Sequence, residues 1–315
     1  MAPLRIVFMG TPELAGASLR ALLRSADIQI TAVVTQPDHP KGRGLKVQSS
    51  PVKEIALAEK LPVLQPARAR DPAFAEELQR FQPDLIAVTA FGQILPATIL
   101  DLPRFGCLNV HTSLLPKYRG AAPIQWAILN DESETGVTIM KMDAGMDTGG
   151  ILTQEKTTIE PDDDSQSLHD RLGRIGAELL VKTIPDYVSG KIQPRAQPVE
   201  GVSYAPKIKK LDGAINWAHP ARDEWNRVRA MVPWPSAFTT LPGESRPAVL
   251  KILAADVVQH SGPIGEIIRA DAAGIVVACG TDALRVHALQ REGGRRLNAR
   301  DFLAGHRLRP GQRLG

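Results

Sequence analysis

The residues best suited to chemistry belong to two short segments of the chain. Segment 107–111 is an apolar run whose alternation places Asn109 and His111 on one side of a strand, at its carboxyl end. Open α/β sheets bind their ligands at that end. The glycine-rich segment 143–150 follows another apolar run and presents the carboxylate of Asp147. The pattern predicts that an asparagine, a histidine and an aspartate meet in one pocket.

These three residue types suit the transfer of an acyl group to an amine. An asparagine amide can donate to the oxygen of a tetrahedral intermediate. A neutral histidine can accept the proton of the attacking amine, and a protonated one can stabilise the oxyanion. The aspartate can hold the histidine tautomer or order a water that relays protons. Each residue alone also has an ordinary structural explanation, as a turn residue or a strand-end histidine, so their grouping carries the argument.

The common cofactor fingerprints are absent from the sequence. The turn after the first apolar run reads Gly10-Thr11-Pro12-Glu13, which is no dinucleotide-binding G-x-G-x-x-G motif. There is no P-loop, no H-E-x-x-H, no paired C-x-x-C and no G-x-S-x-G elbow. We therefore expect no nucleotide cofactor, no metal and no covalent enzyme intermediate. Cys107 and Cys279 lie in apolar runs and are expected to be buried free thiols.

The front of the chain alternates strand-like and helix-like segments. Apolar runs predict strands at 4–9, 28–35, 84–89, 108–111 and 136–142. A helix is expected after the first strand, with Thr11 as its N-cap, and a long amphipathic helix is expected at 165–187. Near-continuous apolar strands separated by helices are typical of a doubly wound, mostly parallel sheet covered on both faces.

The back of the chain has a different pattern. Proline-rich segment 190–206 has little periodicity and is expected to be a linker. Short alternating runs at 264–269, 275–279 and 284–289 then favour a small OB-like β-barrel or a strongly twisted sheet. The 315 residues are therefore divided into a catalytic domain at 1–189, the linker, and a second domain at 207–315.

Charge is unevenly distributed between these parts. The net charge of +4 combines about +7 in 207–315 with about −3 in 1–206. A basic back half favours a polyanion as partner, although an arginine-rich surface alone would look the same. No apolar run is long enough for a membrane span, and the amino terminus has no signal core. We expect a cytoplasmic monomer that binds neither membranes nor DNA.

The site segments also resemble a known signature. Asn109-x-His111-x-Ser113-Leu114-Leu115-Pro116-x-Tyr118-Arg119-Gly120-Ala121-x-Pro123-Ile124 resembles that of the 10-formyltetrahydrofolate-dependent formyltransferases, and Asp147 matches the aspartate of that family. The resemblance implies a Rossmann-like catalytic domain, 10-formyltetrahydrofolate as formyl donor, and a catalytic trio of Asn109, His111 and Asp147. It also implies a folate site that includes Phe91, Ile94, Leu95, Ser113, Leu114, Leu115 and Pro116.

Three further stretches, at 9–13, 36–53 and 204–237, resemble the branch of this family that formylates the α-amine of methionyl initiator tRNA. Together the similar stretches extend over nearly the whole chain. The resemblance implies that loop 36–50 contacts the acceptor end of the tRNA, with Arg43 important. Asn216 departs from the pattern, which usually has aspartate there. The expected tRNA contacts are Lys41, Arg43, Lys46, Lys207, Lys209 and Lys210.

Other activities stay open on the sequence. An amino-sugar nucleotide formyltransferase would have the same donor and trio, but it would not need the basic loop or a back domain of this charge. A formyltetrahydrofolate hydrolase usually has a longer chain. An RNA-binding protein without activity would not need an intact trio.

Overall fold

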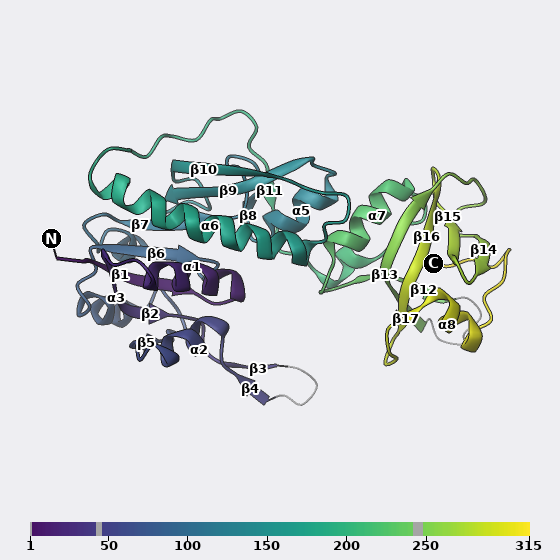
Figure 1. The fold of residues 1–315 in the computed structure, drawn as a ribbon, viewed down its shortest axis with the longest axis horizontal. Coiled ribbons are helices and arrows are strands. Elements are labelled where there is room, and N and C mark those ends of the chain that lie inside the picture. Colours follow the sequence, from purple (N-terminus) through teal and green to yellow (C-terminus); the bar gives the residue numbers. More distant parts are fainter. Residues whose placement is uncertain (1, 42–45, 242–247) are drawn as a thin grey trace. The chain divides into compact units, whose positions relative to one another are not determined.

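The computed structural model describes residues 2–41, 46–241 and 248–315. The chain forms two compact units (Figure 1). The first contains Met1–Pro123, Glu134–Thr158 and His169–Pro206. The second contains Ile124–Ser133, Ile159–Leu168 and Lys207–Gly315, so two short pieces of the front half belong to it.

A seven-stranded sheet forms the centre of the first unit, in the order β10-β9-β7-β6-β1-β2-β5. The neighbours from β7 to β5 are parallel, whereas β9 is antiparallel to both β7 and β10. The doubly wound, mostly parallel fold is thus confirmed, with the expected strand at 136–142 running against its neighbours. The strands are β1 (Leu4–Gly10), β2 (Ile28–Val34), β5 (Val63–Leu64), β6 (Leu85–Thr89), β7 (Cys107–His111), β9 (Glu134–Lys141) and β10 (Gly150–Thr158).

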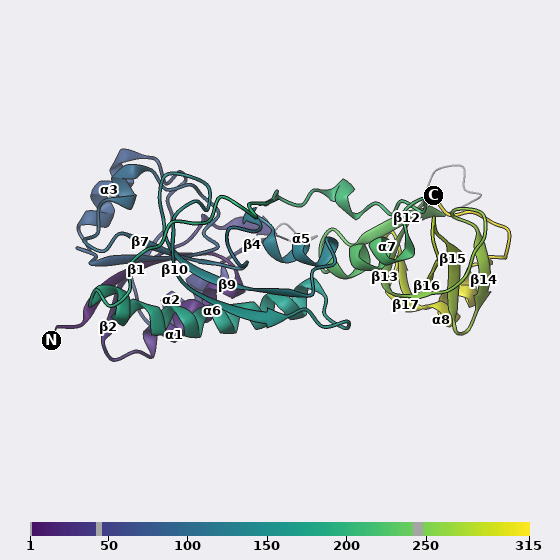
Figure 2. The same cartoon turned by 90° about the horizontal axis from the view of Figure 1, so that it is seen from above.

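Helices cover both faces of this sheet. Figure 2 shows α3 on one side and α1, α2 and α6 on the other. The α3 side also includes α4, because both helices contribute to one apolar core with β1, β2 and β6. The helices of residues 1–188 are α1 (Glu13–Leu23), α2 (Pro51–Ala58), α3 (Pro72–Gln79), α4 (Ala97–Leu100), α5 (Pro123–Leu129), nearly all of which belongs to the second unit, and α6 (Ser165–Val188).

The prediction that Thr11 is the N-cap of the first helix is wrong. Pro12 occupies the N-cap position of α1 and makes no side-chain cap hydrogen bond. The hydroxyl of Thr11 instead donates to the Phe91 carbonyl at 3.3 Å and accepts from the Gln36 amide at 3.4 Å. Thr11 therefore links the loops at the carboxyl ends of β1, β2 and β6.

Two small strand pairs lie beside the main sheet. Parallel strands β8 (Arg119–Gly120) and β11 (Tyr204–Ala205) join the signature region to the segment expected as a linker (Figure 1). Antiparallel strands β3 (His39–Lys41) and β4 (Lys46–Gln48) form part of the expected loop 36–50.

The second unit contains a six-stranded antiparallel sheet. Its order is β12-β13-β16-β15-β14, with β17 paired to β16. Trp217 and Phe302 lie in its core, and the Trp217 indole donates to the Thr239 hydroxyl at 3.1 Å. The elements are η1 (Lys210–Gly213), α7 (Ala221–Ala230), β12 (Ala237–Leu241), β13 (Ala248–Val258), β14 (Ile267–Asp271), β15 (Gly274–Ala278), β16 (Ala283–Arg291), β17 (Leu297–Asn298) and α8 (Ala299–Gly305).

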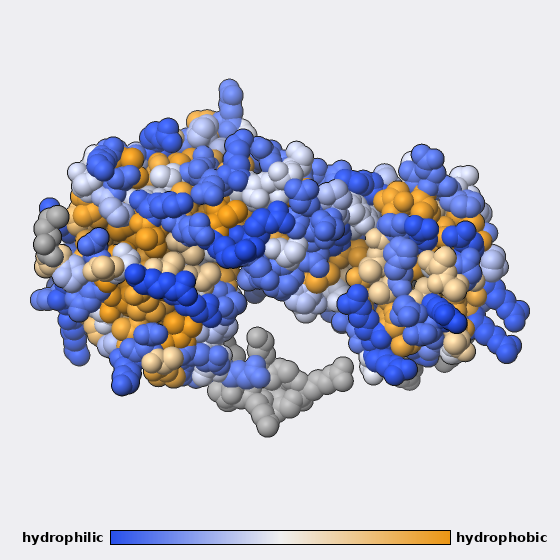
Figure 3. Space-filling view, in the orientation of Figure 1, coloured by the Kyte–Doolittle hydropathy of each residue, from blue (hydrophilic) through white to orange (hydrophobic). Residues whose placement is uncertain are grey.

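The surface of both units is mostly hydrophilic on the face shown in Figure 3, and the two cysteines are buried. Hydrophilic side chains surround smaller apolar areas on the face of each unit shown in Figure 3. Among the described residues, no helix has the length and apolar character needed to cross a membrane. Cys107 and Cys279 are buried free thiols, as the sequence predicts.

Candidate active site

Strand β7, which carries Asn109 and His111, directs its side chains alternately to the two faces of the sheet. Val110 faces α6, because a Cβ at Gly176 of that helix would lie only 2.6 Å from a Val110 methyl. Asn109 and His111 must therefore point to the opposite face. Both are buried, with exposed fractions of 9% and 6%. A close helix contact behind the strand thus holds the two polar side chains at its carboxyl end.

Hydrogen bonding of His111 identifies its basic nitrogen. The Nε2 atom lies 2.9 Å from the carbonyl oxygen of Tyr118. A carbonyl only accepts, so Nε2 carries the hydrogen of the neutral ring and Nδ1 keeps its lone pair. The Nδ1 atom lies 3.7 Å from Oδ2 of Asp147. The ring therefore presents Nδ1 as the proton acceptor, on the side of the Asp147 carboxylate.

Asp147 is held in place by backbone groups. Its Oδ2 accepts from the Gly120 amide at 2.8 Å, and its side chain is 17% exposed. Asp147 and Tyr118 both have positive φ angles, +53° and +60°. Such angles are uncommon outside glycine and gather at functional sites. The two residues that contact the imidazole thus both have strained backbones.

Asn109 is available to a substrate. Its carboxamide makes no hydrogen bond to any other described residue, although the residue is only 9% exposed. Cys107, on the same side of β7, is no alternative nucleophile. Burial, followed by the charge of Asp101, raises the pKa of its thiol to about 12. At neutral pH this thiol stays protonated and unreactive. The site therefore offers a hydrogen-bond donor and a base.

The residues expected to hold the folate differ in exposure. Phe91 and Leu95 are 2% and 3% exposed and pack in the core with α3 and α4. Ser113 is fully buried, and its hydroxyl donates to the Lys117 carbonyl at 2.6 Å. These three shape the loops around the trio. Ile94, by contrast, is 80% exposed.

The signature loop has its own small core. Leu115 packs with Met140 and Ile151 and is buried. Leu114 and Pro116, on either side of it, are partly exposed. The loop thus places surfaces that a ligand can contact directly after β7.

The residues expected to contact tRNA belong to other segments of the chain than the trio. Lys207, Lys209 and Lys210 are exposed at the start of the C-terminal part of the second unit. Lys41 and Lys46 face each other in the β3–β4 pair, but their side chains lie outside the described structure, as does all of Arg43.

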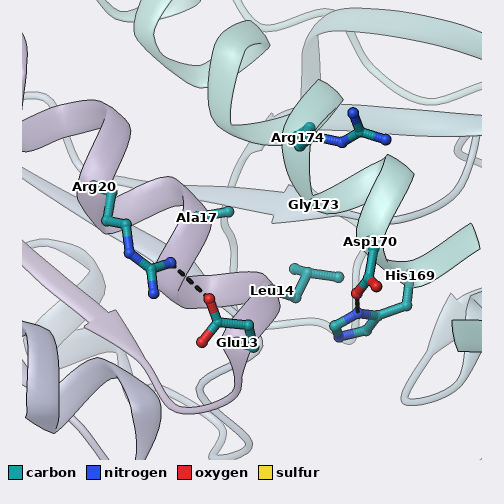
Figure 4. A pocket seen from close by; sticks show the side chains of 8 residues that line it. All are labelled: Glu13, Leu14, Ala17, Arg20, His169, Asp170, Gly173 and Arg174. Carbon is teal, nitrogen blue, oxygen red and sulfur yellow. Dashed lines mark hydrogen bonds and ion pairs between the residues drawn. The ribbon is translucent and has the colours of Figure 1, made fainter. Parts of the chain in front are cut away.

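A separate groove lies between α1 and α6 (Figure 4). Its volume is about 350 Å³. Figure 4 shows Arg20 paired with Glu13 and His169 paired with Asp170. The two ion pairs measure 2.6 and 2.9 Å. The groove is on the α1 side of the sheet, and none of the predicted site residues lines it. It is therefore distinct from the candidate active site.

Sequence reasoning missed three groups around the trio. The Tyr118 carbonyl and the Gly120 amide lie inside the signature, but they act through the backbone, which a residue pattern does not display. Gln197 donates to the Asp147 carbonyl at 2.8 Å from the expected linker. Nothing in the local sequence distinguishes Gln197 from its neighbours. No cluster of acidic, histidine or cysteine side chains in the described part of the chain could hold a metal ion.

Comparison with known proteins identifies the family of this chain. Residues 4–184 match the formyl transferase family, and residues 207–307 match the formyl transferase C-terminal domain. The chain therefore belongs to the formyltransferase family. At the level of particular proteins, it is similar along its whole length to methionyl-tRNA formyltransferases. That of Geobacter sulfurreducens is 48% identical, with 100% of this chain and 98% of the relative covered. That of Citrifermentans bemidjiense is 50% identical with the same coverage.

A solved structure shares the fold at lower identity. WlaRD, a sugar 3N-formyltransferase crystallised in the presence of dTDP and 5-N-formyl-tetrahydrofolate, superposes with a TM-score of 0.65. The match covers 91% of this chain and 98% of that one at 19% identity. At this identity the likeness extends to the fold alone.

Proposed function

We propose that this enzyme transfers the formyl group of 10-formyltetrahydrofolate to the α-amine of methionyl initiator tRNA, for translation initiation. Family membership supports formyl transfer, and the full-length relatives at 48% and 50% identity support this acceptor over an amino-sugar nucleotide. The observation that carries the chemistry is the imidazole of His111, whose Nδ1 lies 3.7 Å from the Asp147 carboxylate, on the same side of β7 as the buried Asn109.

The residues divide the work of the transfer. The folate supplies a formyl group on N10. As the amine nitrogen bonds to the formyl carbon, the Asn109 amide donates to the oxygen that gains negative charge. His111 Nδ1 takes the proton that the amine loses, and the nearby Asp147 carboxylate stabilises the imidazolium. When the carbon–N10 bond breaks, its electron pair stays on N10, and His111 returns the proton there. The products are the formylated amine and tetrahydrofolate.

Substrate contacts complete the proposal. Exposed Ile94 and the partly exposed Leu114 and Pro116 contact the folate, while buried Phe91, Leu95, Ser113 and Leu115 support the walls of its site. The tRNA binds through Lys41, Arg43 and Lys46 of the 36–50 loop and through the lysines at 207, 209 and 210. Counterion release at these cations makes tRNA binding weaken as salt rises. The enzyme acts as a cytoplasmic monomer.

Formylation assays with parallel acceptors test this function. The enzyme is given 10-formyltetrahydrofolate with methionyl initiator tRNA, methionyl elongator tRNA or a dTDP-amino sugar. We expect rapid formylation of the initiator tRNA and at least about 100-fold slower reaction with the others, a ratio within reach of differential binding. Preferred transfer to the sugar would instead establish the amino-sugar enzyme, and binding of tRNA without any turnover would refute catalysis.

A further inference from the structure

Residues 195–205, expected as part of a linker, are hydrogen-bonded to the loops of the active site. Arg195 and Ile151 exchange backbone hydrogen bonds of 2.8 and 2.9 Å. The Arg119 amide donates to the Ser203 carbonyl at 2.9 Å, and the Tyr118 amide donates to the Ser203 hydroxyl at 2.9 Å. This segment is therefore a fixed part of the first unit, attached to β10 at one end and to the signature loop at the other.

Gln197 makes the most informative contacts in this segment. Its Nε2 donates to the carbonyl oxygens of Asp147 and Gly149, both at 2.8 Å. These bonds hold the loop at the residue whose φ is +53°. A backbone in that region persists only when its surroundings hold it there. Gln197 thus secures the main chain of Asp147, while the Gly120 amide secures its carboxylate.

Arg119 determines which way the Gln197 amide points. Its Nε and Nη2 atoms both donate to Oε1 of Gln197, at 3.0 and 2.7 Å. Because a guanidinium only donates, Oε1 must face Arg119 and the NH₂ group must face the two carbonyls. The pair forms a directed chain from Arg119 through Gln197 to the backbone of Asp147.

We propose that Gln197 is a positioning residue for formyl transfer, and that Arg119 acts through it. The pair holds the Asp147 carboxylate at the distance where it stabilises the protonated His111 ring. Neither side chain needs to touch a substrate for this role. The inference rests on the proposed formyl transfer at this site and adds a pair of residues to which the sequence assigned no role.

The variant Gln197→Glu removes the hydrogen bonds that position Asp147 but keeps the size and shape of the side chain. Glutamate keeps the length and can still accept from Arg119, but it cannot donate to the two carbonyls and repels them. We expect kcat to fall about 10- to 100-fold, since a misplacement near 1 Å can have an effect of about 100-fold. The KM values for donor and tRNA should change less than threefold. Gln193→Glu, the same change at an exposed residue just before this segment with no hydrogen bond to another described residue, is the matched control.

Two results of that comparison would overturn the proposal. One is a kcat for Gln197→Glu within threefold of wild type or equal to that of Gln193→Glu. The other is a loss that lies in KM, because this would place Gln197 in substrate binding.

A second pair of variants tests the role of Arg119. If Arg119 acts only through Gln197, Arg119→Met should reduce kcat, and adding it to Gln197→Met should reduce kcat no further. Independent, multiplying losses would show that Arg119 has its own contact with a substrate.

Hydrogen–deuterium exchange tests the role of Gln197 and Arg119 without any formyl-accepting substrate. Amides of 143–150 should exchange faster in Gln197→Glu than in wild type or Gln193→Glu, whereas those of β14 to β16 should not change. Unchanged exchange in 143–150 would refute the proposal. If wild-type enzyme fails to formylate tRNA, the proposed function fails, but this measurement and turnover with an amino sugar still test the pair.

Discussion

Replacement of Asp147 by asparagine removes one negative charge with little change of shape. Asparagine tolerates the φ of +53° at this position better than most residues. Its side-chain oxygen can still accept from the Gly120 amide. That oxygen would take the place of Oδ2, the atom nearest His111 Nδ1, and the amide nitrogen would take the place of Oδ1. The substitution therefore tests the charge and not the loop.

The distance between His111 Nδ1 and Asp147 Oδ2 determines how much the substitution lowers kcat. Unit charges 3.7 Å apart attract by about 4.5 kcal/mol at an effective dielectric constant of about 20. Because the carboxylate is 17% exposed, water screens part of this, and we expect about 2–4 kcal/mol of lost transition-state stabilisation. At about 1.4 kcal/mol per factor of ten, kcat should fall about 30- to 1000-fold.

Single-turnover formylation with saturating donor and tRNA measures the loss. Asp143→Asn is the control, because Asp143 lies in the same loop and its Oδ1 accepts from the Gly145 amide and the Thr148 hydroxyl. Asparagine can accept both bonds, so kcat should stay within about threefold of wild type. If Asp147→Asn keeps a third of the wild-type kcat, or if Asp143→Asn loses as much, the electrostatic role of Asp147 is refuted.

Three further predictions concern the amide, the strand support and the thiols. Asn109→Ala should lower kcat about 100- to 1000-fold without lowering the unfolding temperature, and a smaller kinetic loss would exclude it as an oxyanion donor. Gly176→Ala should destabilise the protein by about 1–3 kcal/mol relative to Gly173→Ala, because a Cβ meets a Val110 methyl at 2.6 Å in the first case and nothing closer than 3.6 Å in the second. Equal urea midpoints for the two would contradict the packing argument. Burial raises the pKa of both cysteine thiols to about 12, so only about one thiol in ten thousand is a thiolate at pH 8. A disulfide reagent should therefore label the native protein slowly and the urea-unfolded protein completely. Rapid native labelling of Cys107 would show that its strand is accessible.

Strand positions were predictable because their signal is local. Apolar runs at 4–9 and 28–35 match β1 and β2 within one residue at each end. The direction of a strand relative to its neighbours was not predictable in the same way. The run at 136–142 has the composition of a parallel strand, yet β9 is antiparallel to β7, because hydrophobic periodicity is the same in both directions. Similarly, Thr11 has the residue type of a helix cap, but tertiary partners take its hydroxyl.

For the candidate site, the order of amino acids alone placed Asn109 and His111 on one side of a strand, since alternation is a property of the extended backbone. It also pointed to the family, because the signature is a continuous pattern. It could not establish that Asp147 lies 3.7 Å from His111, or that Gln197 holds the backbone of Asp147. Those contacts join residues that are 36 and 50 positions apart in the chain. Such approaches depend on how the sheet, the signature loop and segment 195–205 pack together, and packing is decided only when the whole first unit has folded.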